Sequence, residues 1–142
     1  MLSFLRKREK GMAVIQRQSH STVYVRDQEE ALAFYRDILG FEVRDDVTMD
    51  SFRWLTVSPK GQPDFEIVLF PAPPEMRELV EKGTFTFGVG VLETDDIHGD
   101  YERLKKQGVE FTSPPEERRY GGVDTGFKDN SGNFFSLRQR EK

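Results

Sequence analysis

The stretch Ala31-Leu-Ala-Phe-Tyr-Arg-Asp-Ile-Leu-Gly-Phe41 decides how this chain is organised. Its apolar side chains recur with the spacing of one face of an amphipathic helix, at Ala31, Phe34, Tyr35, Ile38 and Leu39. Asp27 is placed to cap the N-terminus, with Glu30 three residues later, and Gly40 follows the last periodic residue, where glycine can end a helix. The pattern predicts a helix over Asp27–Leu39.

Strands are predicted on both sides of this helix. Before it, Ser19-His-Ser-Thr-Val-Tyr-Val25 is rich in β-branched and aromatic residues, which favour strands. After it, similar runs predict three further strands, over Phe41–Met49, Phe52–Val57 and Phe65–Phe70. The first half of the chain therefore reads β-α-β-β-β.

The second half repeats that order. Thr84–Leu92 predicts a strand and Ile97–Gln107 a helix, with Asp96 and Gly108 placed as Asp27 and Gly40 are in the first half. Three strands are expected after it, over Val109–Thr112, about Asp124–Lys128, and Phe134–Arg138. Both helices should bury one side against a sheet, through Phe34, Tyr35, Ile38, Tyr101 and Leu104.

The predicted domain organisation follows from this repeat. Residues 1–18 are expected to form an N-terminal arm, and residues 19–142 a single domain. Within the domain, the repeats span about residues 19–70 and 84–138, joined by a proline-rich linker and a short helix within residues 71–83. The linker is Pro71-Ala-Pro-Pro74 and the helix Glu75–Lys82.

Composition excludes several classes of protein. The chain has 142 residues, 21 basic against 25 acidic, and a formal net charge of −4, which argues against a nucleic-acid partner. It has no cysteine, so disulfides, thiolate catalysis and cysteine-based metal sites are excluded, and its two histidines limit any other metal site. No apolar run is long enough to span a membrane, and the basic residues near the N-terminus follow its apolar start instead of preceding it. We expect a cytoplasmic protein with no membrane partner.

Several stretches match one known family. They are His20-Ser-Thr-Val-Tyr-Val-Arg-Asp27, Ala31–Phe41, Asp95-Asp-Ile97, Leu104-Lys-Lys-Gln-Gly-Val-Glu-Phe111, Tyr120-Gly-Gly122 and Phe127-Lys-Asp-Asn-Ser-Gly-Asn-Phe-Phe135. Together they span about residues 19–138, and through them the sequence resembles the vicinal oxygen chelate superfamily, also called the glyoxalase/bleomycin-resistance/extradiol-dioxygenase fold. The resemblance implies an α+β fold of two βαβββ modules, whose cupped sheets surround a ligand cavity. It says little about chemistry, because one fold hosts many functions.

The resemblance also implies where a metal would bind. Metal-dependent relatives carry one ligand on the first and one on the fourth strand of each half. In the first half, His20 matches the position on the first strand, and the family register favours Val68 over Glu66 on the fourth strand. In the second half, the matching positions are held by Gly88 or Val89 and by Ser136. We therefore expect no cofactor, and disfavour a divalent metal; His20 and Glu66 would be its ligands if one were bound.

A set of mostly aromatic and polar residues is expected to face the cavity and bind a ligand: His20, Tyr24, Trp54, Val68, Phe70, Tyr120, Phe127 and Ser136. The pattern does not settle which face of its strand Trp54 occupies. The charged run Glu116–Arg119 predicts a solvated surface, with Arg118 or Arg119 as an alternative clamp for an anionic ligand. His98 should lie on the surface.

Two functions stay open. The first is a family protein that binds a small, planar or apolar ligand in its cavity and has lost the metal site. The alternative is an enzyme of the same superfamily, a lyase, isomerase or dioxygenase-like protein, either metal-dependent or metal-free with His20 and Glu66 as acid and base. A homodimer is expected in both cases, because open cupped sheets leave unpaired edges.

Overall fold

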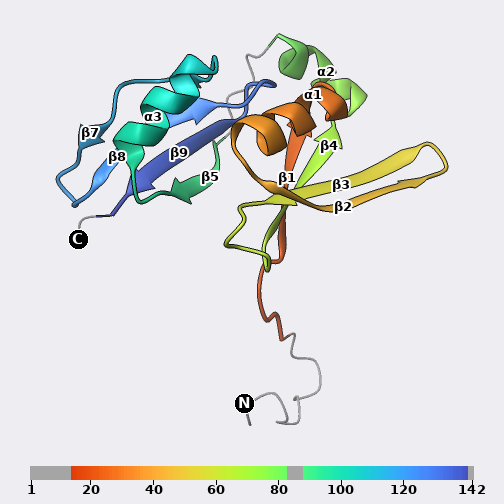
Figure 1. The fold of residues 1–142 in the computed structure, drawn as a ribbon. Coiled ribbons are helices and arrows are strands. Elements are labelled where there is room, and N and C mark those ends of the chain that lie inside the picture. The colour runs from red at the N-terminus through yellow and green to blue at the C-terminus, as the bar shows by residue number, and fades with distance from the viewer. Residues whose placement is uncertain (1–13, 83–87, 141–142) are drawn as a thin grey trace.

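A computed structural model of the chain describes residues 14–82 and 88–140. It contains two separate sheets that lie side by side (Figure 1). Sheet A has the strand order β1-β4-β3-β2, made of β1 (His20–Val25), β4 (Glu66–Pro71), β3 (Phe52–Ser58) and β2 (Glu42–Met49). Sheet B has the order β5-β9-β8-β6, made of β5 (Gly88–Glu93), β9 (Phe134–Gln139), β8 (Val123–Lys128) and β6 (Glu110–Phe111).

The two sheets share one topology. In each, the first strand of the module pairs in parallel with the last, β1 with β4 and β5 with β9, and the remaining main pairs are antiparallel. A short strand β7 (Glu116–Glu117) also pairs with β8. The structure thus has the predicted α+β class with two βαβββ modules.

The helices cover the same side of both sheets (Figure 1). They are α1 (Gln28–Leu32), continued by the π-helix η2 (Ala33–Ile38), then α2 (Pro74–Glu81) and α3 (Ile97–Lys106). Asp27 caps α1 as predicted, since its Oδ1 accepts the backbone N–H of Glu30 at 2.9 Å. Gly40 and Gly108 both follow their helices with positive φ, 78° and 93°.

The first long helix departs from the prediction in its second half. The Leu39 N–H bonds the carbonyl of Phe34, five residues back, instead of four. The wider π turn rotates less per residue, so neighbouring side chains point in more similar directions. Phe34 and Tyr35 are both buried, as predicted, whereas Ile38 is only partly buried.

The core lies between the helices and the sheets and is continuous across both modules. Tyr35 is fully buried, donates a 2.6 Å hydrogen bond to Asp129 of the β8–β9 turn, and contacts the ring of Phe135 edge-on at 6.1 Å. Burial, followed by the charge of Asp129 and that hydrogen bond, raises the pKa of Tyr35 well above its usual value. This hydrogen bond links the π-helix η2 of the first module to the β8–β9 turn of the second module.

The other strands match the predicted ones to within a few residues at their ends. The predicted strand Thr84–Leu92 is observed from Gly88; its first four residues lie outside the described part of the chain. The same holds for residues 1–13 of the predicted arm, while residues 14–18 are exposed and outside the sheets. No helix within the described residues is long and apolar enough to cross a membrane.

Candidate functional site

Strand alternation gives sheet A one face covered by helices and one open face. Val23, Val25, Leu55 and Leu69 point to the helices and are at most 2% exposed. The register pairs the intervening residues His20 with Glu66, Thr22 with Val68, and Tyr24 with Phe70, so these six share the open face. Thr56 pairs with Val68, which places Trp54 and Phe52 on the open face as well.

Aromatic rings gather on this open face. We call the set His20, Tyr24, Phe52, Trp54 and Phe70 the aromatic face. Its ring centroids are 5.9 Å apart for His20 and Trp54, 5.6 Å for Phe52 and Phe70, and 6.5 Å for Tyr24 and Phe70. Val47 and Met49 of β2 pair with Trp54 and Phe52 and are about half exposed, at 48% and 54%. The result is a broad apolar surface open to solvent.

Polar groups line the His20 end of the aromatic face. Glu66 Oε1 accepts a 2.5 Å hydrogen bond from Thr56, while Oε2 lies 3.7 Å from His20 Nε2. His20 Nδ1 is 2.8 Å from the Ser19 hydroxyl. Asp45 accepts a 3.4 Å bond from the Trp54 indole N–H. The two candidate acid–base residues thus lie together, and both ring nitrogens of His20 have a neighbour.

Sequence reasoning missed three residues here. Phe52 and Thr56 could have been found from Trp54 by counting two residues either way along the strand. Asp45 could not, because strict alternation would place it on the same face as Val43. A register shift between Val43 and Asp45 pairs Val43 with Val57 of the core and Asp45 with Thr56 of the open face. Such a β-bulge leaves no clear local signal.

Sheet B has an open face of a different kind. Val91 pairs with Ser136, and Ser136 with Gly126, so small side chains occupy its centre and Val91 is 62% exposed. The aromatic ring of Phe134 fills the space over Gly126, 2.5 Å from where a Cβ would sit. This face therefore carries small side chains, the ring of Phe134 and the exposed Val91.

Charged residues surround Tyr120 at one end of sheet B. Tyr120 is 68% exposed and donates a hydrogen bond to Asp124, and the Arg138 guanidinium lies 5.6 Å from its ring centre. The bond to Asp124 raises the pKa of Tyr120. Burial opposes ionisation of Asp124, but the bonds from Tyr120 and from Arg118 outweigh it and lower the pKa of the carboxyl. Arg118 Nε is 2.6 Å from Asp124, so the guanidinium group of Arg118 already has a carboxylate partner within the chain.

One expected ligand-binding residue lies elsewhere. Phe127 is 1% exposed and stacks on Phe135 in the core, 5.6 Å between ring centres. The expectation that Phe127 faces the cavity side is wrong, because Gly126 occupies the open face and alternation turns the next residue inward. Val68 lies on the open face but is only 3% exposed, because its larger neighbours cover it. His98 is exposed, as expected.

The strand register relates the positions at which the resemblance implies metal ligands. Thr22 pairs with Val68 as Val91 pairs with Ser136, which makes Val68 and Ser136 equivalent. Gly88 pairs with Phe134 as His20 pairs with Glu66, so the register shift in β5 makes Gly88 the counterpart of His20. Of the four positions only His20 carries an imidazole, and none carries a carboxylate, so the donor set does not fit a catalytic divalent ion. Within residues 14–82 and 88–140, no group of three or more histidine and acidic side chains could hold a metal.

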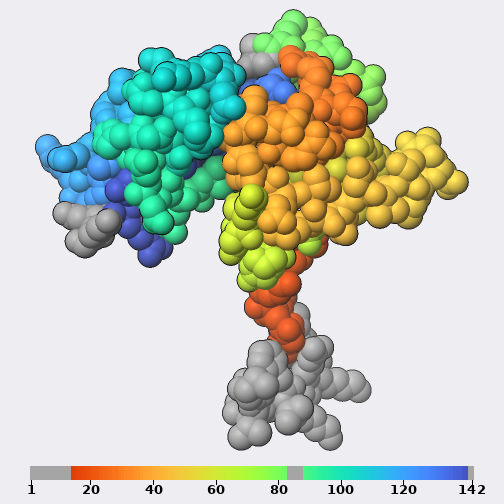
Figure 2. Space-filling model, in the orientation of Figure 1, coloured from red at the N-terminus to blue at the C-terminus, as the bar shows by residue number. Residues whose placement is uncertain are grey.

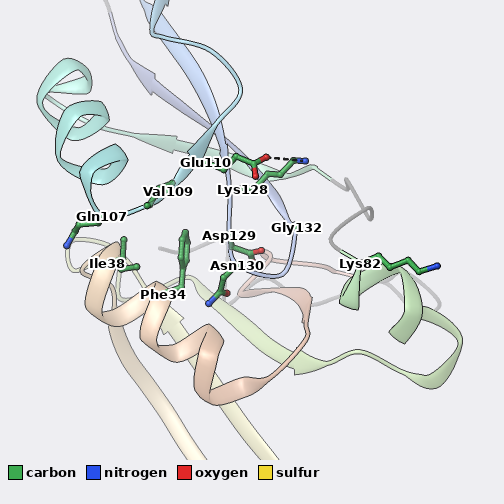
Figure 3. Close-up of a pocket in the computed structure, with 11 residues that line it drawn as sticks. Phe34, Ile38, Lys82, Gln107, Val109, Glu110, Lys128, Asp129, Asn130 and Gly132 are labelled. Carbon is green, nitrogen blue, oxygen red and sulfur yellow. Dashed lines mark ion pairs between the residues drawn. The ribbon is translucent and has the colours of Figure 1, made fainter.

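Three hollows lie near the open faces or between the modules. One of about 490 Å³ adjoins the aromatic face through Thr22 and Tyr24 and is also lined by Met76 and Val89. A second, of about 750 Å³, lies between the β3–β4 loop and the lobe of α3 and β5, where Figure 2 shows the surface hollowed. The third, of about 410 Å³, is on the helix side, between Phe34, Ile38 and the β8–β9 turn (Figure 3). Of these three hollows, only the first is lined by a residue of the aromatic face, Tyr24.

Three solved structures are similar over nearly the whole chain. UcmS2 shares 45% sequence identity at a TM-score of 0.78, covering 88% of this chain and 98% of that one. TnmS3, an antibiotic binding protein from Streptomyces sp. CB03234, shares 32% identity at a TM-score of 0.74, covering 92% and 100%. The bleomycin resistance determinant encoded on transposon Tn5 shares 25% identity at a TM-score of 0.61, covering 89% and 100%.

The family match agrees with the fold and with these neighbours. The profile of the Glyoxalase/Bleomycin resistance protein/Dioxygenase superfamily matches residues 17–137, which include both modules and every residue of the aromatic face. The chain belongs to the Glyoxalase/Bleomycin resistance protein/Dioxygenase superfamily.

Proposed function

We propose that this protein binds a small planar or apolar molecule on the aromatic face and releases it unchanged. The observation that carries the proposal is the open cluster of rings: Trp54, Phe52 and Phe70 lie on one face of sheet A, with Phe52 itself 37% exposed. Aromatic rings held in a rigid sheet form a stacking surface for a planar ligand. Exposing them to water without a ligand is costly.

The comparisons favour binding over chemistry. TnmS3 is described as an antibiotic binding protein, and the Tn5 protein as a bleomycin resistance determinant. The residues at the four family metal positions also argue for binding, because Val68, Gly88 and Ser136 cannot replace carboxylate or imidazole ligands. No step of the proposed function passes through a metal.

A second candidate is a metal-free enzyme that uses His20 and Glu66. The 3.7 Å approach of His20 Nε2 to Glu66 supports it, because a carboxylate beside an imidazole is a common acid–base arrangement. Against it, Nε2 faces Glu66 and Nδ1 faces the Ser19 hydroxyl, so neither ring nitrogen is directed at a substrate over Trp54. Binding is therefore the better supported function.

We further propose that two copies of the chain complete the site. A ligand cavity buries most of its occupant's surface, whereas the aromatic face is an open wall. Sheet B offers the exposed Val91 on its own open face. The hairpin of β2 and β3 projects beyond the rest of sheet A (Figure 1), and its strand β2 contains the exposed Val47 and Met49. A two-fold dimer that sets sheet A of one protomer against sheet B of its partner would cover both surfaces.

Calorimetric titration with anthracenemethanol, a neutral planar probe, tests the binding function. We expect saturable binding that falls by about fivefold or more in Trp54→Ala, since stacking contributes on the order of 1 kcal/mol. Trp54→Phe, which keeps a ring, should retain most of the affinity, and EDTA should change nothing. The probe should be recovered with its mass unchanged. Absence of saturable binding, or conversion of the probe, would refute the proposal.

A further inference from the structure

We infer that the ligand of the aromatic face carries a hydrogen-bond donor, preferably a cationic nitrogen, and that Glu66 binds it. This inference rests on the proposed function and specifies the class of molecule that the site selects. It depends on the unused bonding capacity of Glu66 and on the charges of the open face of sheet A.

Glu66 is held in place but not saturated. Its side chain is 21% exposed, and Thr56 fixes Oε1 with a 2.5 Å bond. Among the described residues none donates a hydrogen bond to Oε2, whose nearest basic neighbour, His20 Nε2, is too distant at 3.7 Å. Oε2 is not among the side-chain oxygens buried from solvent, so a donor group of a ligand can reach it. A ligand donor would satisfy it.

The position of Glu66 suits a group attached to a stacked ring. Glu66 pairs directly with His20 across β1 and β4, and the His20 ring is 5.9 Å from the Trp54 ring. A planar ligand over Trp54 would therefore bring a substituent at its edge towards Oε2. An electron-rich aromatic surface next to a carboxylate is the combination that attracts organic cations.

The charges on the open face favour the same class. Asp45 adds a second carboxylate beside the Trp54 indole. The nearby arginines already have partners. Arg44 donates a 2.6 Å hydrogen bond to Ser58, and Arg53 forms an ion pair with Asp46 at 2.8 Å. His20 is then the remaining basic side chain of the aromatic face. On sheet A itself an anionic ligand would meet two carboxylates and no unpaired guanidinium, so it should be rejected.

Three tricyclic probes of similar size and different charge test this inference: aminoacridine, anthracenemethanol and anthracenecarboxylate. Trp54 is the only tryptophan of the chain, so quenching of its fluorescence reports occupancy. At a pH of about 8 an ordinary imidazole is neutral. We expect the cation to bind at least about tenfold more tightly than the anion, as a charge-assisted bond allows.

Variants assign the preference to Glu66. Glu66→Gln should weaken aminoacridine about tenfold and anthracenemethanol much less. Glu102→Gln, an exposed site on α3 that removes the same charge, should leave all three affinities unchanged. Equal binding of the three probes by the native protein would overturn this inference while the proposed function stands. An equal loss of both probes in Glu66→Gln would also overturn it. If no probe quenches saturably, the proposed function fails as well.

Discussion

The buried pair of Tyr35 and Asp129 shows how a single contact joins the modules. Asp129 is 6% exposed, and both its oxygens are occupied: Oδ1 accepts the N–H groups of Ser131 and Asn133, and Oδ2 accepts the Tyr35 hydroxyl and the Asn133 amide. A buried carboxylate is tolerated only with such a complete set of donors. Asn133 also donates to the Tyr24 carbonyl, so the same network reaches the aromatic face.

Replacing Tyr35 with phenylalanine tests this contact. The variant keeps the ring but removes one donor from Asp129, and we expect the free energy of unfolding to fall by about 1–3 kcal/mol. Urea denaturation at fixed protein concentration measures it. Tyr101→Phe is the matched control, because the Tyr101 hydroxyl contacts only the Lys105 ammonium at 3.2 Å among the described residues, and should cost less than about 0.5 kcal/mol. Equal losses in the two variants would contradict the special role of Tyr35.

The same pair predicts a dependence on pH. The folded pKa of Tyr35 is raised, so its contribution to stability is complete below the ordinary tyrosine pKa of about 10 and is lost as pH rises beyond it, when the unfolded chain releases the proton. The stability difference between native protein and Tyr35→Phe should therefore be constant from neutral pH to about 9 and shrink above 10. Denaturation curves across this range measure it. A difference that grows at alkaline pH would exclude this account.

At the scale of elements, the helix starts are determined by local capping. Asp27 and Asp96 each accept a backbone N–H three residues later, from Glu30 at 2.9 Å and from Gly99 at 3.0 Å. This equivalence is why the repeat can be read in the sequence. The strand β2 is different, because its bulge beside Arg44 exchanges the faces of the residues that follow.

Removing a cap has a predictable cost. Asp27→Ala should lower the free energy of unfolding by about 1 kcal/mol, because the first turn of α1 loses its acceptor. Asp95→Ala removes the same charge from an exposed residue next to a cap and should stay within about 0.5 kcal/mol of the native value. Thermal and urea unfolding compare the two. A loss as large in Asp95→Ala would mean that charge, and not capping, is responsible.

For the whole molecule, the decisive property is that the two open faces do not cover each other within one chain. Val91 on sheet B and Met49 on sheet A remain 62% and 54% exposed. A monomer would leave both to water, whereas a second copy can bury them. The ligand site is therefore expected to depend on assembly.

Light scattering at micromolar concentration tests the assembly. We expect a mass of about twice the 16.5 kDa of one chain. Val91→Glu should shift the protein towards the monomer, because it would bury a carboxylate in the interface, opposite the acidic groups of sheet A. Glu117→Gln, an exposed change elsewhere on sheet B, should leave the mass unchanged. A native protein that runs as a single chain would contradict the proposed dimer.

The sequence by itself determined the repeat, the helix starts, the strand order along the chain and the family resemblance, because each depends on residues within a few positions of one another. Tertiary structure alone decided which side chains share a surface. Strand pairing placed Trp54 beside His20, a bulge brought Asp45 to the open face, and Phe127 turned into the core because Gly126 took the outer position. These outcomes depend on contacts between distant strands, and on a register in which a shift of one residue exchanges the two faces of a sheet.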